Sequence, residues 1–168
     1  MEIKEQLTQM FLMQKTLNQN ILKEFGQEAM TEEKLQMAII DELGELTHEL
    51  KGDWCWWKKT QKPVDRKRVL EELVDVYHFV MTYEMEYGVT DGSIVEILKY
   101  YEFAIKRYGK NTLQGDLMNY YISDVANKDY KLNNLLYLTE KLGFTMKEVY
   151  QEYLNKNKIN YERLKNGY

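Results

Sequence analysis

Two pairs of acidic residues lie beside the apolar stripes of two predicted helices. Glu42 and Glu45 form the first pair, and Glu72 and Asp75 form the second. Residues three apart share one face of a helix, so the two members of each pair point in the same direction. If the two faces meet, four carboxylates surround one small volume, and their repulsion and desolvation require an opposing charge. A divalent cation such as Mg²⁺, which takes oxygen ligands and substrate phosphates, would supply that charge.

Apolar residues recur at helical spacing along most of the chain, and no stretch shows the alternation that is typical of a strand. The pattern predicts an all-α fold, a helical bundle with a four-helix-type catalytic core and additional C-terminal helices. The expected helices cover about 4–25, 31–52, 65–88, 93–108, 117–125, 132–142 and 145–167. We expect Gly52 to close the second helix. Asp65 has the position of an N-cap for the third helix, and Thr145 with Glu148 forms a capping box at the start of the last.

The composition narrows the class of protein. The chain has 168 residues, of which 44% are hydrophobic, enough for one domain with a real core. The net charge of −4 disfavours direct nucleic-acid binding. No apolar run approaches the roughly 20 residues of a membrane span, and the N-terminus lacks the pattern of a secretory signal. The single cysteine, Cys55, agrees with a reducing compartment, so we expect a cytoplasmic protein without membrane attachment.

Two groups of polar residues have an ordinary structural interpretation when spacing alone is considered. Gln14 and Asn18 are four apart on the first predicted helix, which is compatible with an exposed polar face. Lys156, Asn160 and Arg163 recur at intervals of four and three on the last predicted helix. Such spacing usually indicates an exposed, salt-bridged surface. A functional interpretation of either group needs an independent reason.

A run of aromatic residues follows the first acidic pair. Residues 54–57 contain three tryptophans, too many for a surface loop unless they pack or bind something. One interpretation is a hydrophobic plug between helices. The other is an aromatic platform for a flat ligand such as a base, with Lys58 reaching a phosphate. Both can hold together. His78 lies one turn after Asp75, and an isolated histidine in a helix is more often structural than functional.

The two acidic pairs together match the E-x-x-E…E-x-x-D signature of the all-α nucleoside triphosphate pyrophosphohydrolases, the MazG-like superfamily. Four further segments resemble motifs of one family within it, the dimeric dUTPases. In chain order they are residues 14–18 (Q-x-x-L-N), 56–58 (W-W-K), 72–79 (E-L-x-D-x-x-H-F) and 153–163 (Y-x-x-K-N-x-x-N-x-x-R). The matches follow the order of the family's motifs. Cys55 and Leu164 stand where this family often has lysine and glutamine.

The resemblance implies an enzyme that hydrolyses dUTP to dUMP and pyrophosphate, which limits uracil incorporation into DNA and supplies dUMP. Its substrate would be a nucleotide of the dUTP or dUDP type, its cofactor Mg²⁺ and its assembly a homodimer. Residues 1–168 would form a single domain, with 1–88 as the metal-binding catalytic half and 89–168 as a C-terminal helical half that contributes phosphate contacts. The implied metal ligands are Glu42, Glu45, Glu72 and Asp75. Glu45 would also be the catalytic proton acceptor.

The resemblance also assigns contacts with the nucleotide. Its implied base and sugar contacts are Gln14, Asn18 and Trp57. Its implied phosphate contacts are Lys58, Lys156, Asn160 and Arg163. These assignments give the polar faces of the first and last helices a functional interpretation that their spacing alone does not support.

Two other functions remain compatible with the sequence. A related pyrophosphohydrolase would act on dCTP as well as dUTP, because helical spacing does not distinguish the 4-oxo from the 4-amino group of a pyrimidine. In the second alternative the acidic pairs form only a solvated seam of a non-enzymatic helical interaction protein. That alternative predicts no hydrolysis and no effect of divalent ions on stability.

Overall fold

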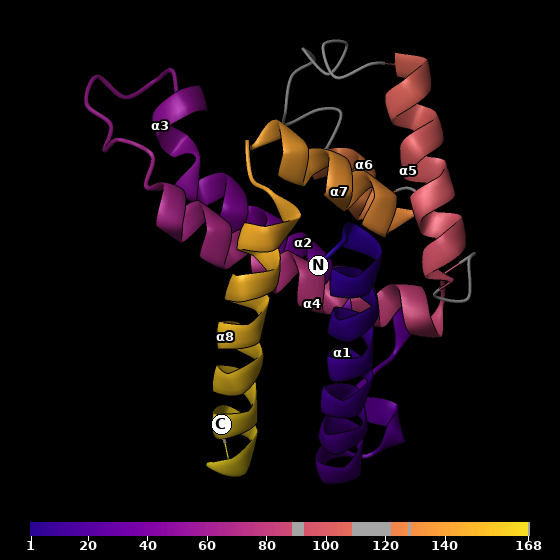
Figure 1. The fold of residues 1–168 in the computed structure, drawn as a ribbon. Coiled ribbons are helices and arrows are strands. Elements are labelled where there is room, and N and C mark those ends of the chain that lie inside the picture. The colour runs from indigo at the N-terminus through magenta and orange to yellow at the C-terminus, as the bar shows by residue number, and fades with distance from the viewer. Residues whose placement is uncertain (89–92, 109–121, 128, 168) are drawn as a thin grey trace.

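The computed structural model describes residues 1–88, 93–108, 122–127 and 129–167 (Figure 1). The all-α prediction is confirmed: these residues form eight α-helices and one short 3-10 helix, and no β-strand occurs among them. In chain order the elements are α1 (Ile3–Phe25), η1 (Gln27–Ala29), α2 (Glu32–Glu49), α3 (Lys51–Trp54), α4 (Arg66–Glu86), α5 (Ile94–Tyr108), α6 (Ser123–Asn127), α7 (Lys131–Lys141) and α8 (Met146–Lys165). No helix in the described ranges is long and apolar enough to cross a membrane.

Helix α4 lies at the centre of the fold and packs against α1, α2, α7 and α8. Its side chains Leu73, Val76 and Val80 are fully buried. Figure 1 shows α1 and α8 side by side, both running from the top of the view to the bottom. One hydrophobic core joins residues from both ends of the chain, from Leu7 to Tyr153. This shared core fixes how each helix is rotated, and therefore which polar side chains face its neighbours.

The predicted signals at the starts of α4 and α8 are confirmed. The Asp65 side chain accepts a hydrogen bond of 2.9 Å from the backbone N–H of Lys67, as an N-cap should. Thr145 and Glu148 form the capping box at the start of α8. The helix expected over 117–125 is described only from its C-terminal part, where α6 begins at Ser123, and residues 117–121 lie outside the described residues.

The expected end of the second helix at Gly52 is wrong. Helix α2 ends at Glu49, and Gly52 lies inside the short helix α3. A Cβ atom at Gly52 would lie 2.8 Å from the carbonyl oxygen of Lys62, a distance that real Cβ contacts do not show. This glycine therefore allows the connection between α3 and α4 to approach α3 closely, and it does not terminate the preceding helix.

Arg66, in the first turn of α4, fixes the connection between α7 and α8. Its Nη2 donates to the carbonyl oxygen of Gly143 at 2.7 Å and lies 3.2 Å from a carboxylate oxygen of Glu148. The guanidinium also stacks 4.0 Å from the ring centroid of Phe144. These contacts hold the start of α8 against the start of α4, and both of these helices carry predicted site residues.

We expect Asp65→Ala to lower the free energy of unfolding by about 1 kcal/mol, because it leaves the first N–H groups of α4 without their side-chain acceptor. Asp65→Ser retains an acceptor and should lose much less. Urea denaturation followed by circular dichroism at 222 nm measures both variants. Equal losses for alanine and serine would show that the cap contributes little to the stability of α4.

Candidate active site

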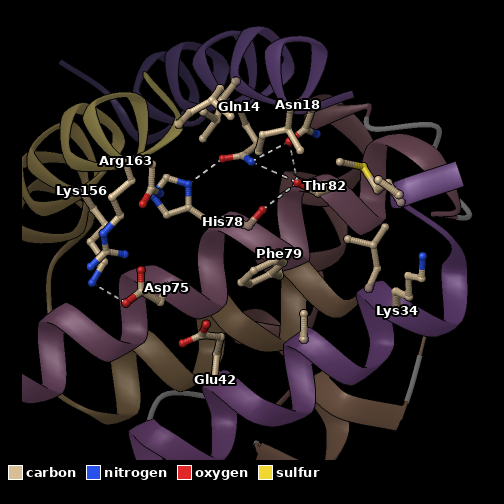
Figure 2. A pocket seen from close by; sticks show the side chains of 18 of the residues that line it. Gln14, Asn18, Lys34, Glu42, Asp75, His78, Phe79, Thr82, Lys156 and Arg163 are labelled. Atoms are coloured by element: carbon tan, nitrogen blue, oxygen red, sulfur yellow. Dashed lines mark hydrogen bonds and ion pairs between the residues drawn. The ribbon is translucent and has the colours of Figure 1, made fainter. Parts of the chain in front are cut away.

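A pocket of about 580 Å³ lies between α1, α2, α4 and α8 (Figure 2). Apolar residues make up part of its lining, namely Leu17, Ile21, Phe25, Ala29, Met30, Leu35, Ala38, Phe79 and Leu164. Its acidic end holds Glu42, Glu45, Glu72 and Asp75 together with the α8 side chains Lys156, Asn160 and Arg163, and Figure 2 shows Lys34 on the opposite side. Gln14, Asn18, His78 and Thr82 also line it. The pocket therefore brings together predicted residues from four segments that are far apart in the sequence.

Three of the four predicted metal ligands form a compact group. Glu42, Glu45 and Glu72 each offer a carboxylate oxygen, and these oxygens lie within 4.8 Å of one another. The side chains come from α2 and α4, whose packing brings the two acidic pairs face to face as the sequence predicts. Carboxylate oxygens at this spacing fit a hard divalent cation such as Mg²⁺, which binds protein oxygens and retains some of its waters.

The acidic residues raise one another's pKa values. Burial raises the pKa of Glu42 to about 7, with further contributions from the negative charges of Asp75, Glu45 and Glu72. Burial and the same kind of repulsion also raise the pKa of Glu72. The pKa of Asp75 is raised by burial as well, although the nearby ammonium of Lys156 opposes the shift. This end of the pocket is thus short of positive charge, as a cation site should be.

Cationic side chains balance part of this negative charge, and among them Arg163 opposes the rise in the pKa of Asp75. Lys156 Nζ on α8 lies 2.5 Å from a carboxylate oxygen of Asp75. Arg68 Nη2 on α4 lies 3.3 Å from Glu49 and 3.4 Å from Glu72. The contribution of Arg68 does not follow from the acidic motifs, although its position four residues before Glu72 is one turn of helix away. Asp75, the fourth predicted metal ligand, is therefore paired with the ammonium of Lys156 in place of a metal ion.

A buried hydrogen-bond network joins α1 to α4 at the wall of the pocket (Figure 2). Gln14 Nε2 donates to Asn18 Oδ1 at 2.9 Å and to Thr82 Oγ1 at 3.1 Å. Gln14 Oε1 lies 2.6 Å from His78 Nδ1. Thr82 Oγ1 in turn lies 2.9 Å from the carbonyl oxygen of His78, one turn earlier. Gln14 and Asn18 are therefore buried on the inner face of α1, and the exposed-face interpretation is wrong.

Helix α8 takes part in the same network through Tyr153. Its hydroxyl donates to Gln14 Oε1 at 2.7 Å, and its ring stacks on His78 with centroids 4.3 Å apart. Burial, helped by the charge of Lys156, lowers the pKa of His78 to about 3, so this imidazole is neutral. Tyr153 begins the 153–163 motif, although no role was predicted for it, and Thr82 lies outside all of the sequence motifs. Helical spacing contained the signal, because Thr82 is one turn after His78 and Tyr153 is one turn before Lys156 and Asn157.

Trp57 and Lys58 do not line this pocket. They lie in the connection between α3 and α4, where Trp57 is 56% and Trp56 is 87% exposed. Trp54 is half-buried and donates from Nε1 to the carbonyl oxygen of Thr47 at 2.9 Å. The plug interpretation thus describes Trp54, whereas Trp56 and Trp57 present their rings to the surface. The predicted contacts of Trp57 and Lys58 with a nucleotide stay a prediction.

Comparison with known families matches residues 6–168 to the model of a family described as dUTPase. The chain belongs to the all-α dUTPase family. The match includes all four helices that surround the pocket and every motif on which the resemblance was based. A dUTPase acts on dUTP, so this chain is an enzyme of the dUTP diphosphatase class. A search of curated proteins finds no match.

The raised pKa of Glu42 predicts a pH dependence of stability. The carboxyl titrates near 4.5 in the unfolded chain and near 7 in the folded protein. Between these values the folded state holds the proton more tightly, so the contribution to stability is complete below pH 4.5 and is lost as pH rises through 7. In the absence of divalent ions, we expect the Glu42→Gln variant not to show this loss of stability with rising pH.

Urea denaturation in chelator, from about pH 5 to about pH 8, checks this expectation. The free energy of unfolding of the wild type should fall relative to that of Glu42→Gln across the range. Glu33→Gln removes an exposed carboxylate from the same helix and should follow the wild type. Parallel curves for the wild type and Glu42→Gln would contradict the electrostatic account of the acidic group.

Proposed function

We propose that the chain hydrolyses dUTP to dUMP and pyrophosphate with Mg²⁺ at the acidic end of the pocket. In the cell this reaction would limit uracil incorporation into DNA and supply dUMP. The observation that supports it best is the continuity of one pocket, whose lining includes the acidic group, two α8 cations and a set of apolar side chains. Its volume of about 580 Å³ suits a small-molecule ligand.

Glu42, Glu45 and Glu72 would hold Mg²⁺, and Asp75 would join them when Lys156 moves away from it. When bound, Mg²⁺ neutralises phosphate charge and helps to position and activate the attacking water. Glu45 is exposed, so a water molecule can reach its carboxylate. We assign to Glu45 the role of proton acceptor during attack on the phosphate chain.

The α8 side chains Lys156, Asn160 and Arg163 would contact the phosphate oxygens. All three line the acidic end of the pocket, beside the carboxylates that would hold the cation. Arginine can bind two phosphate oxygens at once through its planar guanidinium. The base and sugar would then extend toward Gln14 and Asn18, where Phe79 offers an aromatic surface.

We expect pyrophosphate release to require Mg²⁺ and to be fastest with dUTP in a panel that includes dCTP, dTTP and dATP. Asp75→Asn should reduce turnover by roughly 100-fold or more while leaving the protein folded. Burial and the neighbouring carboxylates raise the pKa of Asp75 despite its ion pair with Lys156, so its charge is not a net source of stability in the metal-free protein. Thermal unfolding in chelator measures the fold. Asp53→Asn, an exposed acid in α3, is the matched control. Metal-independent turnover would contradict the assignment, and equal rates with dCTP would favour the broader enzyme.

We propose that the chain forms a homodimer in which the exposed connection between α3 and α4 meets the second copy. Trp57 and Lys58 lie outside the pocket of their own chain. We propose that they reach the nucleotide bound by the second copy, where the indole would pack on the nucleoside and the ammonium would contact a phosphate. In this arrangement the exposed aromatic side chains pack against a bound nucleotide, and each active site depends on residues from both chains.

Mixing two inactive variants tests this shared site. Asp75→Asn and Lys58→Ala place their defects in different parts of the chain, so a mixed dimer has one active site with both defects and one with neither. Random mixing of unfolded chains followed by refolding should therefore restore about a quarter of the wild-type activity, since half of the dimers are mixed. If Lys58 serves the pocket of its own chain, every active site retains a defect and no activity returns.

A further inference from the structure

Gln14 uses all of its hydrogen-bonding capacity on other side chains of the protein. Its two N–H groups point to Asn18 Oδ1 and Thr82 Oγ1. Its carbonyl oxygen has two contacts as well, with His78 Nδ1 and the Tyr153 hydroxyl. An amide has two donor hydrogens and two acceptor lone pairs, so nothing remains for a ligand. Gln14 therefore acts on a nucleotide through its neighbours.

The orientation of this amide follows from two hydroxyl protons. Thr82 Oγ1 lies 2.9 Å from the carbonyl oxygen of His78 and 3.2 Å from Asn18 Oδ1. Both of these oxygens only accept, so the Thr82 proton goes to one of them and the Thr82 oxygen accepts from Gln14 Nε2. The Tyr153 hydroxyl lies 2.7 Å from Gln14 Oε1 and 3.3 Å from the carbonyl oxygen of Met10, so it donates over the shorter distance to Gln14. Both hydrogen bonds therefore favour the amide orientation in which the side-chain oxygen of Gln14 faces His78.

The Gln14 oxygen then determines which nitrogen of His78 carries the proton. An amide oxygen only accepts, so the 2.6 Å contact requires a proton on His78 Nδ1. The imidazole is neutral, because burial lowers its pKa to about 3. A neutral imidazole carries one proton, so Nε2 has a free lone pair. With the Gln14 amide turned over, the same network would place the proton on Nε2 instead.

Two buried polar atoms at the wall of the pocket have no hydrogen-bond partner among the described residues. They are His78 Nε2 and Asn18 Nδ2. Both residues line the pocket, and each is only 4% exposed. A buried polar atom without a partner is unfavourable, and binding sites are places where a ligand supplies the missing bond. The network leaves one acceptor, on His78, and one donor group, on Asn18.

We propose that Thr82 and Tyr153 are positioning residues that orient the Gln14 amide, which in turn holds His78 with its proton on Nδ1. His78 Nε2 then accepts a hydrogen bond from an N–H or O–H of the nucleoside. Asn18 Nδ2 donates a hydrogen bond to one of the nucleoside oxygens. The inference rests on the proposed function, because it assumes that the pocket binds a nucleotide.

Two groups of a deoxyuridine nucleotide can donate to His78. The uracil ring carries N3–H, whereas N3 of cytosine has no proton and would face the His78 lone pair with its own. The sugar carries a 3′-hydroxyl. In the first case the tautomer of His78 selects uracil over cytosine, and in the second it selects a sugar that has a free hydroxyl. The reversed tautomer would disfavour both interactions, because a site built to hydrogen-bond loses affinity when its partner is mismatched.

The tautomer can be observed directly in the ligand-free protein by ¹⁵N NMR of the imidazole nitrogens. The chain has two histidines, so a His48→Gln variant assigns the signals of His78. We expect the Nδ1–H tautomer in the wild type. Thr82→Val and Tyr153→Phe each remove one hydroxyl proton and should populate the Nε2–H form. Thr82→Ser keeps the hydroxyl and should retain the wild-type tautomer.

Matched controls separate this effect from a general loss of packing. Thr139→Val removes another buried threonine hydroxyl that bonds to a carbonyl oxygen one turn earlier, but on α7 away from the pocket. Tyr150→Phe removes a tyrosine hydroxyl that donates to Gln9 on the same helix pair as Tyr153. Both controls should keep the Nδ1–H tautomer of His78. A wild-type protein with its proton on Nε2, or controls that shift the tautomer as much as Thr82→Val, would overturn the proposal.

Binding of non-hydrolysable α,β-imido nucleotides with Mg²⁺ identifies the group that His78 recognises. We expect Thr82→Val to weaken binding of the dUTP analogue roughly fivefold, the effect of about one hydrogen bond, while Thr139→Val leaves it unchanged. If N3–H is the donor, the preference for the uracil over the cytosine analogue should fall in Thr82→Val. If the 3′-hydroxyl is the donor, the preference for the deoxy over the 2′,3′-dideoxy analogue should fall instead.

A Thr82→Val protein with both preferences unchanged would overturn the assignment of His78 as an acceptor for the nucleoside. Failure of the proposed function gives a different result, since the wild type would then neither bind the dUTP analogue nor hydrolyse dUTP. The NMR measurement needs no ligand, so the two failures are distinguishable.

Discussion

The repulsion among carboxylates at the junction of α2 and α4 is the constraint on which the rest of the site depends. The apolar stripes of the two helices are buried against each other and against α1, α7 and α8, and this burial forces the acidic faces together. Burial of apolar surface is favourable enough to hold like charges close, but it leaves Glu42 with a pKa near 7. The hydrophobic core therefore creates a site whose carboxylates are stabilised when a cation binds.

Helix α8 connects the two ends of the pocket. Near its middle, Lys156 contacts Asp75 in the acidic group, while Tyr153, one turn earlier, contacts the Gln14 network. Arg66 in α4 fixes the start of this helix through the carbonyl of Gly143 and the carboxylate of Glu148. A shift of α8 would change the electrostatics of the metal end and the hydrogen bonding of the nucleoside end together. One helix thus joins the acidic group to the Gln14 network, and under the proposed function it would couple phosphate binding to base and sugar recognition.

Much of the fold and of the acidic site could be predicted from the sequence because the signals are local. Apolar spacing indicated the helices, Asp65 and Thr145 marked two of their starts, and the i, i+3 spacing placed Glu42 beside Glu45. Gly52 misled the prediction because a glycine serves equally to end a helix and to allow close approach, and only the position of Lys62 distinguishes the two. Gln14 and Asn18 have a spacing that fits either an exposed or a buried face, so the resemblance to a family was needed to interpret them.

The sequence by itself determined that the chain is helical, that its acidic pairs share helix faces, and that it resembles the dUTPases. Tertiary structure decided which of these groups meet. It placed Lys156 against Asp75, enclosed His78 between Gln14 and Tyr153, and left Trp57 outside the pocket of its own chain. Helical periodicity specifies only the direction of a side chain around its own axis. The partner of a side chain, and hence its charge state and the proton it carries, depends on the packing of helices from distant parts of the sequence.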